Sequence, residues 1–115
     1  MTVNINSILN KLKDETGYPT NEGVYKGKED KYITYVYSDE HCTLYADNSE
    51  QALQADIQLT FYCPDGFNYH ATKKQIKEYL IDKGFQIESV QSFLEPLSDE
   101  TLLRHTVFEI NYTIS

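Results

Sequence analysis

The stretch Gln54-Ala-Asp-Ile-Gln-Leu-Thr-Phe-Tyr-Cys63 decides the fold of this chain. Every second side chain, beginning at Ala55 and ending at Cys63, belongs to the apolar set, whereas the alternate positions carry amide, carboxylate or hydroxyl groups. A period of two is typical of a β-strand that turns one face to the core and the other to water or to a partner. The segment 54–63 is therefore predicted to be a strand, which Pro64-Asp65-Gly66 ends in a turn.

Two helices are predicted on either side of this strand. Apolar residues at three- and four-residue spacing (Ile5, Ile8, Leu9 and Leu12) predict a helix over 4–15. Asn4 or Asn6 is expected to cap its start, and Gly17 stands just past its end. A second helix is predicted over 69–83, with Ile76, Tyr79 and Leu80 on one side and Gly84 in the left-handed position after its last turn.

The remaining segments read as further strands. The β-branched and aromatic residues of 32–37 predict a strand, and Val24-Tyr25 is expected to pair briefly. Ser38-Asp39-Glu40-His41 is expected to break that strand, after which Cys42 to Tyr45 continues or re-enters the sheet. Segments 85–94 and 104–114 alternate as two more strands.

These elements predict one α+β domain over residues 1–115. Its order is α-β-β-β-α-β-β, and its architecture is a two-layer sandwich, mainly an antiparallel sheet covered on one face by two helices. The predicted core consists of Leu9, Leu12, Ile57, Leu59, Phe61, Ile76, Leu80, Phe108 and Ile110.

Composition and charge narrow the classes of function. The chain has 115 residues, enough for one core, and its net charge is −8 from ten basic and eighteen acidic residues. This balance argues against nucleic-acid binding as the main activity and against an anionic membrane surface. No apolar run spans a bilayer, and the start of the chain lacks a secretory signal, so synthesis and retention in the cytosol are expected.

Motifs for catalysis and metal binding are missing from the sequence. It contains no phosphate-binding glycine loop and no nucleophile elbow, and Asp47-Asn48-Ser49-Glu50 lacks the spacing of a calcium loop. A metal site of His41, Cys42, Cys63 and His70 is the alternative to reduced, packed cysteines and solvated histidines, but no pair has the spacing of ligands on one turn. Alternation places Cys63 and His105 on opposite faces, which argues against a nucleophile–base pair. We expect no catalytic residue, cofactor or metal, and a protein that is not an enzyme.

The tyrosines point instead to a partner protein. Several of the ten lie on predicted strands, and tyrosine is favoured at interfaces because it buries a large area and keeps one polar contact. An ordinary amphipathic sheet surface is the alternative. The outward face of the strand (Gln54, Asp56, Gln58, Thr60 and Tyr62) or the loop region 26–50 is expected to form a subunit contact.

A succession of short segments also carries a family resemblance. In order along the chain, these are Tyr32-Ile-Thr-Tyr35, Tyr45-Ala-Asp-Asn48, the 54–63 strand, Lys83-Gly-Phe85, Phe93-Leu-Glu95 and His105-Thr-Val-Phe108. From about residue 18 onward, their order and spacing resemble the tail terminator proteins (tail-to-head joining, minor tail proteins) of long-tailed bacteriophages and prophages of low-GC bacteria.

The resemblance implies a structural virion assembly protein. Such proteins form a ring, commonly a hexamer, that caps the head-proximal end of the tail tube and presents a docking surface for the head connector. The implied partners are other copies of the chain, the tail tube protein and head connector proteins, with no specific nucleic acid and no membrane. The implied location is the tail of the virion, and the bacterial cytoplasm during assembly. Tyr45, Asp47 and Asn48 match the loop pattern of the family. Alternatives are another phage neck or tail-tube component, or a small α+β ligand-binding domain or enzyme.

Overall fold

The computed structural model describes residues 4–44 and 51–114, and its elements follow the predicted order. They are α1 (Ile5–Asn10), α2 (Leu12–Thr16), β1 (Thr20–Glu22), β2 (Tyr32–Leu44), β3 (Gln51–Pro64), α3 (Tyr69–Asp82), β4 (Gln86–Pro96) and β5 (Leu102–Ile114). Together α1 and α2 fill the segment predicted as one helix, with Lys11 between them. The α+β class and the order α-β-β-β-α-β-β are confirmed.

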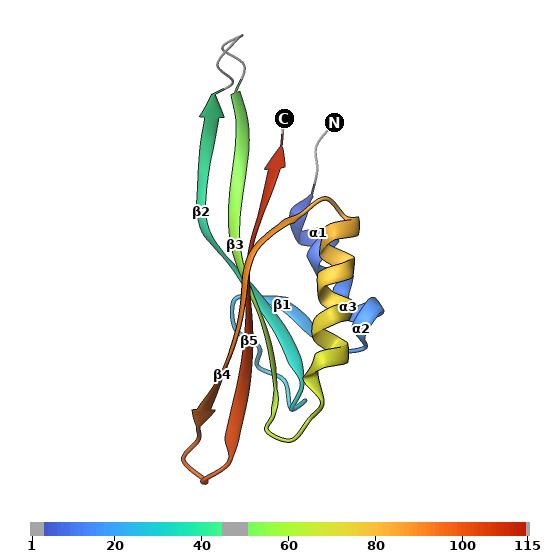
Figure 1. Ribbon diagram of the computed structural model, residues 1–115, viewed down its shortest axis with the longest axis vertical. Helices are drawn as coiled ribbons and strands as arrows, with labels where there is room; N and C mark the ends of the chain where they lie inside the picture. The colour runs from blue at the N-terminus through green and yellow to red at the C-terminus, as the bar shows by residue number, and fades with distance from the viewer. Residues whose placement is uncertain (1–3, 45–50, 115) are drawn as a thin grey trace.

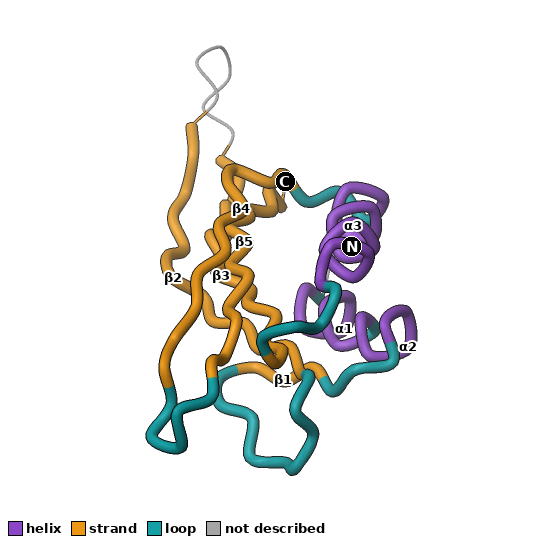
Figure 2. The backbone as a smooth tube through the Cα atoms, turned by 60° about the horizontal axis from the view of Figure 1, so that its bottom comes forward, coloured by secondary structure: helices purple, strands orange, loops and turns teal. Residues whose placement is uncertain are grey.

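The five strands form one mixed, mostly antiparallel open sheet in the order β1-β2-β3-β5-β4. Only β1 and β2 run parallel, and β3, the strand with the clearest alternation, lies in the middle. All helices lie on one side of this sheet (Figures 1 and 2). The molecule measures 56 × 25 × 24 Å because the β2–β3 and β4–β5 hairpins extend past the helices in opposite directions (Figure 1).

The core lies between the sheet and the helices, as the apolar pattern requires. All nine residues predicted for it are buried, and Tyr35, Ile33 and Phe85 join them. Two tyrosine hydroxyls connect the elements around this core: Tyr35 of β2 donates to Asn10 Oδ1 of α1 at 2.9 Å and joins the sheet to the helices. Tyr79 of α3 donates to the carbonyl of Ile8 at 2.6 Å and joins α3 to α1. In residues 4–44 and 51–114, no helix is long and apolar enough to cross a membrane.

The capping residue and the glycines at the helix ends have the roles predicted for them. The side chain of Asn4 accepts a hydrogen bond from the backbone N–H of Ser7, so Asn4 rather than Asn6 is the cap. Gly17 and Gly84 follow their helices with φ of 82° and 95°, values that favour glycine because a side chain is strained there.

Two predictions about the strands are wrong. Val24-Tyr25 is not a strand, and the short strand is Thr20–Glu22, which is held parallel to β2 by the bond from Gly23 N–H to Tyr35 O. Residues 38–41 do not break β2, which runs on to Leu44 because β3 supplies backbone partners. The strand continues through these turn-forming residues because a β-bulge at Ser38 shifts its register with β3. The Ser38 hydroxyl donates to the carbonyl of Asp56 at 3.1 Å.

Candidate interaction surface on the open face of the sheet

One face of the sheet carries no helix of the described residues, and the strand register gives the side chains that point to it. Tyr32, Thr34 and Val36 of β2 lie opposite Tyr62, Thr60 and Gln58 of β3, which in turn lie opposite His105, Val107 and Glu109 of β5. Phe93 of β4 lies opposite His105. We call this the open face. Within the described residues it carries carboxylates, amides, hydroxyls and aromatic rings, but no lysine or arginine.

A row of five rings crosses the open face from one side to the other. Tyr25, in the loop before β2, stacks on Tyr32 with ring centroids 4.5 Å apart, and Tyr32 stacks on Tyr62 at 4.7 Å. Tyr62 meets the His105 ring edge-on at 4.6 Å, and His105 stacks on Phe93 at 4.8 Å. Pairs at these separations each stabilise a structure by about 0.5–1.5 kcal/mol beyond burial. We call this set the aromatic row.

Tyr25 reaches the aromatic row because its own loop folds under it. The backbone N–H of Glu29 donates to the Tyr25 hydroxyl at 3.0 Å. A Cβ atom at Gly27 would come within 2.0 Å of that hydroxyl. Glycine at position 27 therefore leaves the space that the Tyr25 ring occupies.

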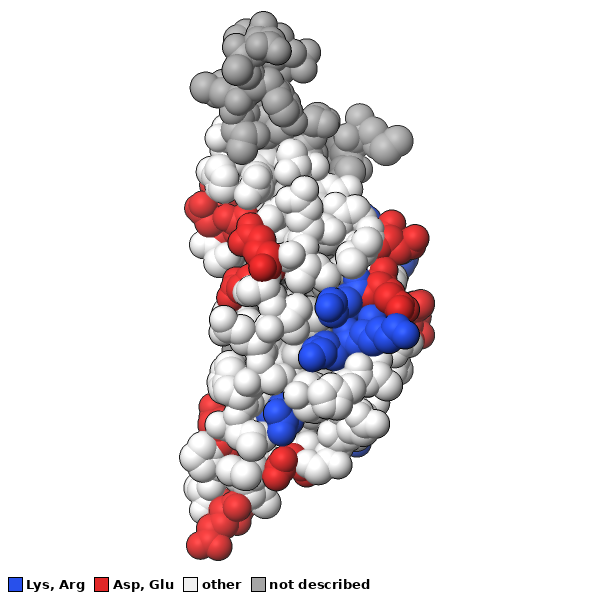
Figure 3. All heavy atoms as spheres, viewed as in Figure 1, with Lys and Arg blue, Asp and Glu red and all other residues white. Residues whose placement is uncertain are grey.

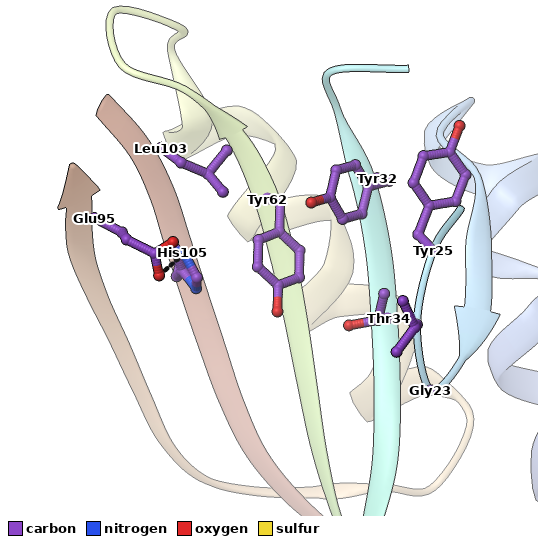
Figure 4. Close-up of a pocket in the computed structure, with 9 residues that line it drawn as sticks. Gly23, Tyr25, Tyr32, Thr34, Tyr62, Glu95, Leu103 and His105 are labelled. Carbon is purple, nitrogen blue, oxygen red and sulfur yellow. Dashed lines mark ion pairs between the residues drawn. The ribbon is translucent and has the colours of Figure 1, made fainter. Parts of the chain in front are cut away.

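The aromatic row borders a hollow of about 310 Å³ (Figure 4). Its lining comes from four strands and a loop: Gly23, Val24, Tyr25, Tyr32, Thr34, Tyr62, Glu95, Leu103 and His105. His105 Nε2 lies 3.4 Å from Glu95 Oε2, and the two face each other at one side of the hollow (Figure 4). This buried nitrogen makes no hydrogen bond to the described residues, because the contact with Glu95 has ion-pair distance without hydrogen-bond geometry. The pair is ionic only when the imidazole is protonated.

The Glu95 carboxylate brings negative charge to the hollow. Burial, followed by the neighbouring Tyr62, Glu95 and Tyr25, raises the pKa of Tyr32 above its ordinary value. Its phenol therefore stays neutral and remains a hydrogen-bond donor. The Glu95 carboxylate is the acidic group of this hollow, and its negative charge attracts a cation.

The predicted contact residues of β3 all point to the open face but differ in access. Gln58 is exposed, and Gln54, Asp56 and Tyr62 are half-buried. Thr60 is only 7% exposed because its neighbours, Thr34 among them, close over it, so it is not a free contact residue. The predicted contact residues Tyr45, Asp47 and Asn48 lie outside the described residues.

The Gln54 and Gln58 amides of β3 are already engaged within the molecule. Gln58 Nε2 donates to Glu109 Oε1 at 3.2 Å, and Gln54 Nε2 donates to Asp56 Oδ1 at 3.0 Å. Asn111 lies on the same face, yet it is buried and donates to Glu88 Oε1 at 2.6 Å. Gln54 and Gln58 are therefore occupied by neighbouring carboxylates, whereas Gln91 of β4, opposite Val107 on the same face, is exposed.

The histidines and cysteines discussed as a metal set are dispersed. His41 lies on β2 rather than in a turn, His70 lies in the first turn of α3, and Cys42 and Cys63 lie at opposite ends of the β2–β3 ladder. Cys63 is buried, and burial raises the pKa of its thiol. Its position faces the helices, whereas His105 on the neighbouring strand faces the open side.

A different cluster of possible ligands forms where β2 bulges. His41 Nδ1 lies 2.9 Å from Asp39 Oδ2 and 4.0 Å from Asp56 Oδ2. Asp39 and Asp56 sit directly opposite each other on neighbouring strands, an arrangement of like charges that destabilises a sheet unless a cation lies between them. His41 is the residue that the structure places beside both carboxylates.

Sequence reasoning missed the aromatic row and the hollow. The sequence identifies Tyr62 and His105 as outward residues, but their neighbours depend on strand register. Phe93 and Glu95 reach His105 because the β4–β5 connection pairs Pro96 with Leu102. Tyr25 was placed in a strand, whereas its position depends on the loop at Gly27.

Comparison with protein families and with curated proteins does not assign this chain to a family. No protein-family model matches the chain, and none of the curated proteins matches it.

Proposed function

We propose that this protein is a structural assembly component of a phage tail, a tail terminator that forms a ring with copies of itself at the end of the tail tube. The observation that carries the proposal is the open face, an entire side of a five-stranded sheet without a covering element in the described chain and crossed by the aromatic row. An exposed surface rich in aromatic rings is typical of a protein interface. The succession of segments that resembles tail terminators supports the same role.

The charge of the chain suits a ring through which DNA passes. A net charge of −8 per copy repels phosphate, so such a ring would not hold the genome as it moves. Ring closure needs two different complementary faces on each copy, and a two-layer fold offers a sheet face and a helix face. In this proposal the role is structural and requires no catalytic residue or cofactor.

The test is made in a lysate of the phage or prophage that encodes the chain. Deletion of the gene is expected to leave heads and tails that do not join, and the wild-type gene in trans should restore joined particles under electron microscopy. Gln58→Arg places a bulky charge on an exposed position of the open face and is expected to fail to restore them. Ser7→Arg, at an exposed position of α1, serves as the matched control. Joined particles from the deletion strain would overturn the proposed function.

A further inference from the structure

The charges of this molecule are sorted between its two layers. The helices, with the linking Lys11 and the capping Lys83, carry six lysines against four acidic residues, a net charge of +2. The five strands carry one arginine against seven acidic residues, a net charge of −6. In Figure 3 basic side chains gather over α3, while the margin where the strands lie shows acidic side chains only.

The acidic groups of the open face lack lysine or arginine partners within the described chain, and their basic neighbours are the imidazoles of His41 and His105. Asp56, Glu95 and Glu109 point to this face, and none has a lysine or arginine nitrogen within 4.0 Å in the part of the molecule that is described. Arg104, the one arginine in the five described strands, which contain no lysine, lies on the helix side, 4.4 Å from the centre of the Tyr69 ring. In the described residues the carboxylates of the open face are therefore not paired with a permanently charged lysine or arginine.

The exposed side of α3 has the opposite character. Lys73, Lys74, Lys77, Glu78 and Ile81 surround a second hollow of about 280 Å³. Residues spaced by four, such as Lys73, Lys77 and Ile81, lie along one side of a helix. In the described residues neither Lys73 nor Lys77 has a carboxylate within 4.0 Å, and Ile81 is 61% exposed. We call this surface the lysine groove.

We propose that the open face of one copy binds the lysine groove of the next copy, a refinement that rests on the proposed ring. Two open faces would set carboxylates against carboxylates, and two lysine grooves would set ammonium groups against each other, so a two-fold contact through either surface is unfavourable. The pairing of open face with lysine groove brings opposite charges together. Such a heterologous contact repeats around a ring, because each copy keeps one unused surface of each kind.

The hollow beside the aromatic row supplies the contact that orients the neighbour. An ammonium group from the lysine groove would meet the Glu95 carboxylate beside Tyr32 and Tyr62, which also line this hollow. Phe93, 48% exposed at one end of the row, and Ile81 supply apolar area. Exposed ion pairs stabilise weakly, so the charges select the orientation and the apolar contact adds affinity.

Charge reversal with rescue tests the pairing in the purified protein. Glu95→Lys and Lys77→Glu are each expected to weaken self-association about tenfold or more, as measured by sedimentation velocity over a concentration series, because each sets like charges together. The double variant Glu95→Lys/Lys77→Glu reverses both partners and should recover association to within about threefold of wild type. Glu15→Lys and Lys13→Glu make the same changes of charge on α2 and should leave association unchanged. Equal melting temperatures establish that every variant is folded.

The outcomes separate this pairing from the proposed function. Wild-type protein that stays monomeric at its solubility limit, single reversals without effect, or a double variant that is not rescued would each overturn the pairing. If head-to-tail joining in the lysate still depends on the gene, the tail role stands and the contact lies elsewhere. If the reversals behave as expected but deletion leaves particles joined, the assembly is real and the tail role is wrong.

Discussion

At the scale of the residue, the core side of β3 and β5 should dominate stability. Leu59 and Ile110 are 0% and 2% exposed and pack between sheet and helices. Leu59→Ala or Ile110→Ala is predicted to lower the free energy of unfolding by about 2–5 kcal/mol, because each leaves a cavity that the surroundings fill only in part. Urea denaturation measures this loss. A loss below about 1 kcal/mol at both positions would contradict the assigned core face.

The buried phenol of Tyr35 predicts a specific dependence of stability on pH. Burial, with Glu22 and Tyr37 nearby, raises the pKa of Tyr35 to about 12 from the ordinary value of 10.0. Between these two values the unfolded chain loses the proton that the folded protein retains, so this contribution is complete below pH 10 and declines as pH rises toward 12. Tyr35→Phe has no proton to lose, and its unfolding free energy should fall less steeply over that window. Parallel alkaline slopes for the two proteins in urea titrations would contradict this account.

At the scale of the element, β2 divides into two parts with different protection. Ile33 and Tyr35 are buried beneath the helical layer, Thr34 is buried on the open face, and all three pair with both β1 and β3. Residues 38–42 are exposed and pair with β3 alone. Amides of 38–42 are predicted to exchange with solvent faster than those of 33–35, because local opening there exposes little apolar surface. Hydrogen exchange followed by mass spectrometry or NMR measures both sets in one sample. Uniform protection along β2 would mean that another surface of the chain covers the hairpin.

The same division explains what the sequence could predict about the elements. Regular alternation in β3 and the capped apolar stripe of α3 depend on neighbours close in sequence, and both elements form where predicted. The second half of β2 has turn-like residues, and only its partner β3 makes it a strand, through a bulge that local propensity does not encode. β1 was missed for a related reason, since three residues become a strand only by parallel pairing with β2.

Prediction of the candidate site from the sequence was limited in the same way. Alternation alone placed Tyr62, Gln58 and Asp56 on the open face, and the structure agrees. It could not show that Thr60 is covered, or that Phe93, His105 and Tyr62 meet, because those contacts follow from the registers of three strand pairs. A shift of one residue in any register would turn each side chain to the other face.

At the scale of the whole molecule, charge and shape determine which assemblies are favourable. An acidic sheet face and a lysine groove on one elongated subunit favour contacts between unlike surfaces. Repeated contacts of this kind either close into a ring or continue as an open filament, and only the closed form has a fixed number of copies. The proposed ring therefore requires that the repeated contact between copies closes on itself.

Native mass spectrometry of the wild-type chain over a concentration series tests that claim most directly. The account predicts monomer at low concentration and, as concentration rises, one dominant closed oligomer with few species between, because the last contact closes the ring without the cost of adding another copy. A hexamer is the size that the family resemblance implies. Monomer alone at every concentration, or an unbroken series of sizes without a dominant species, would contradict it.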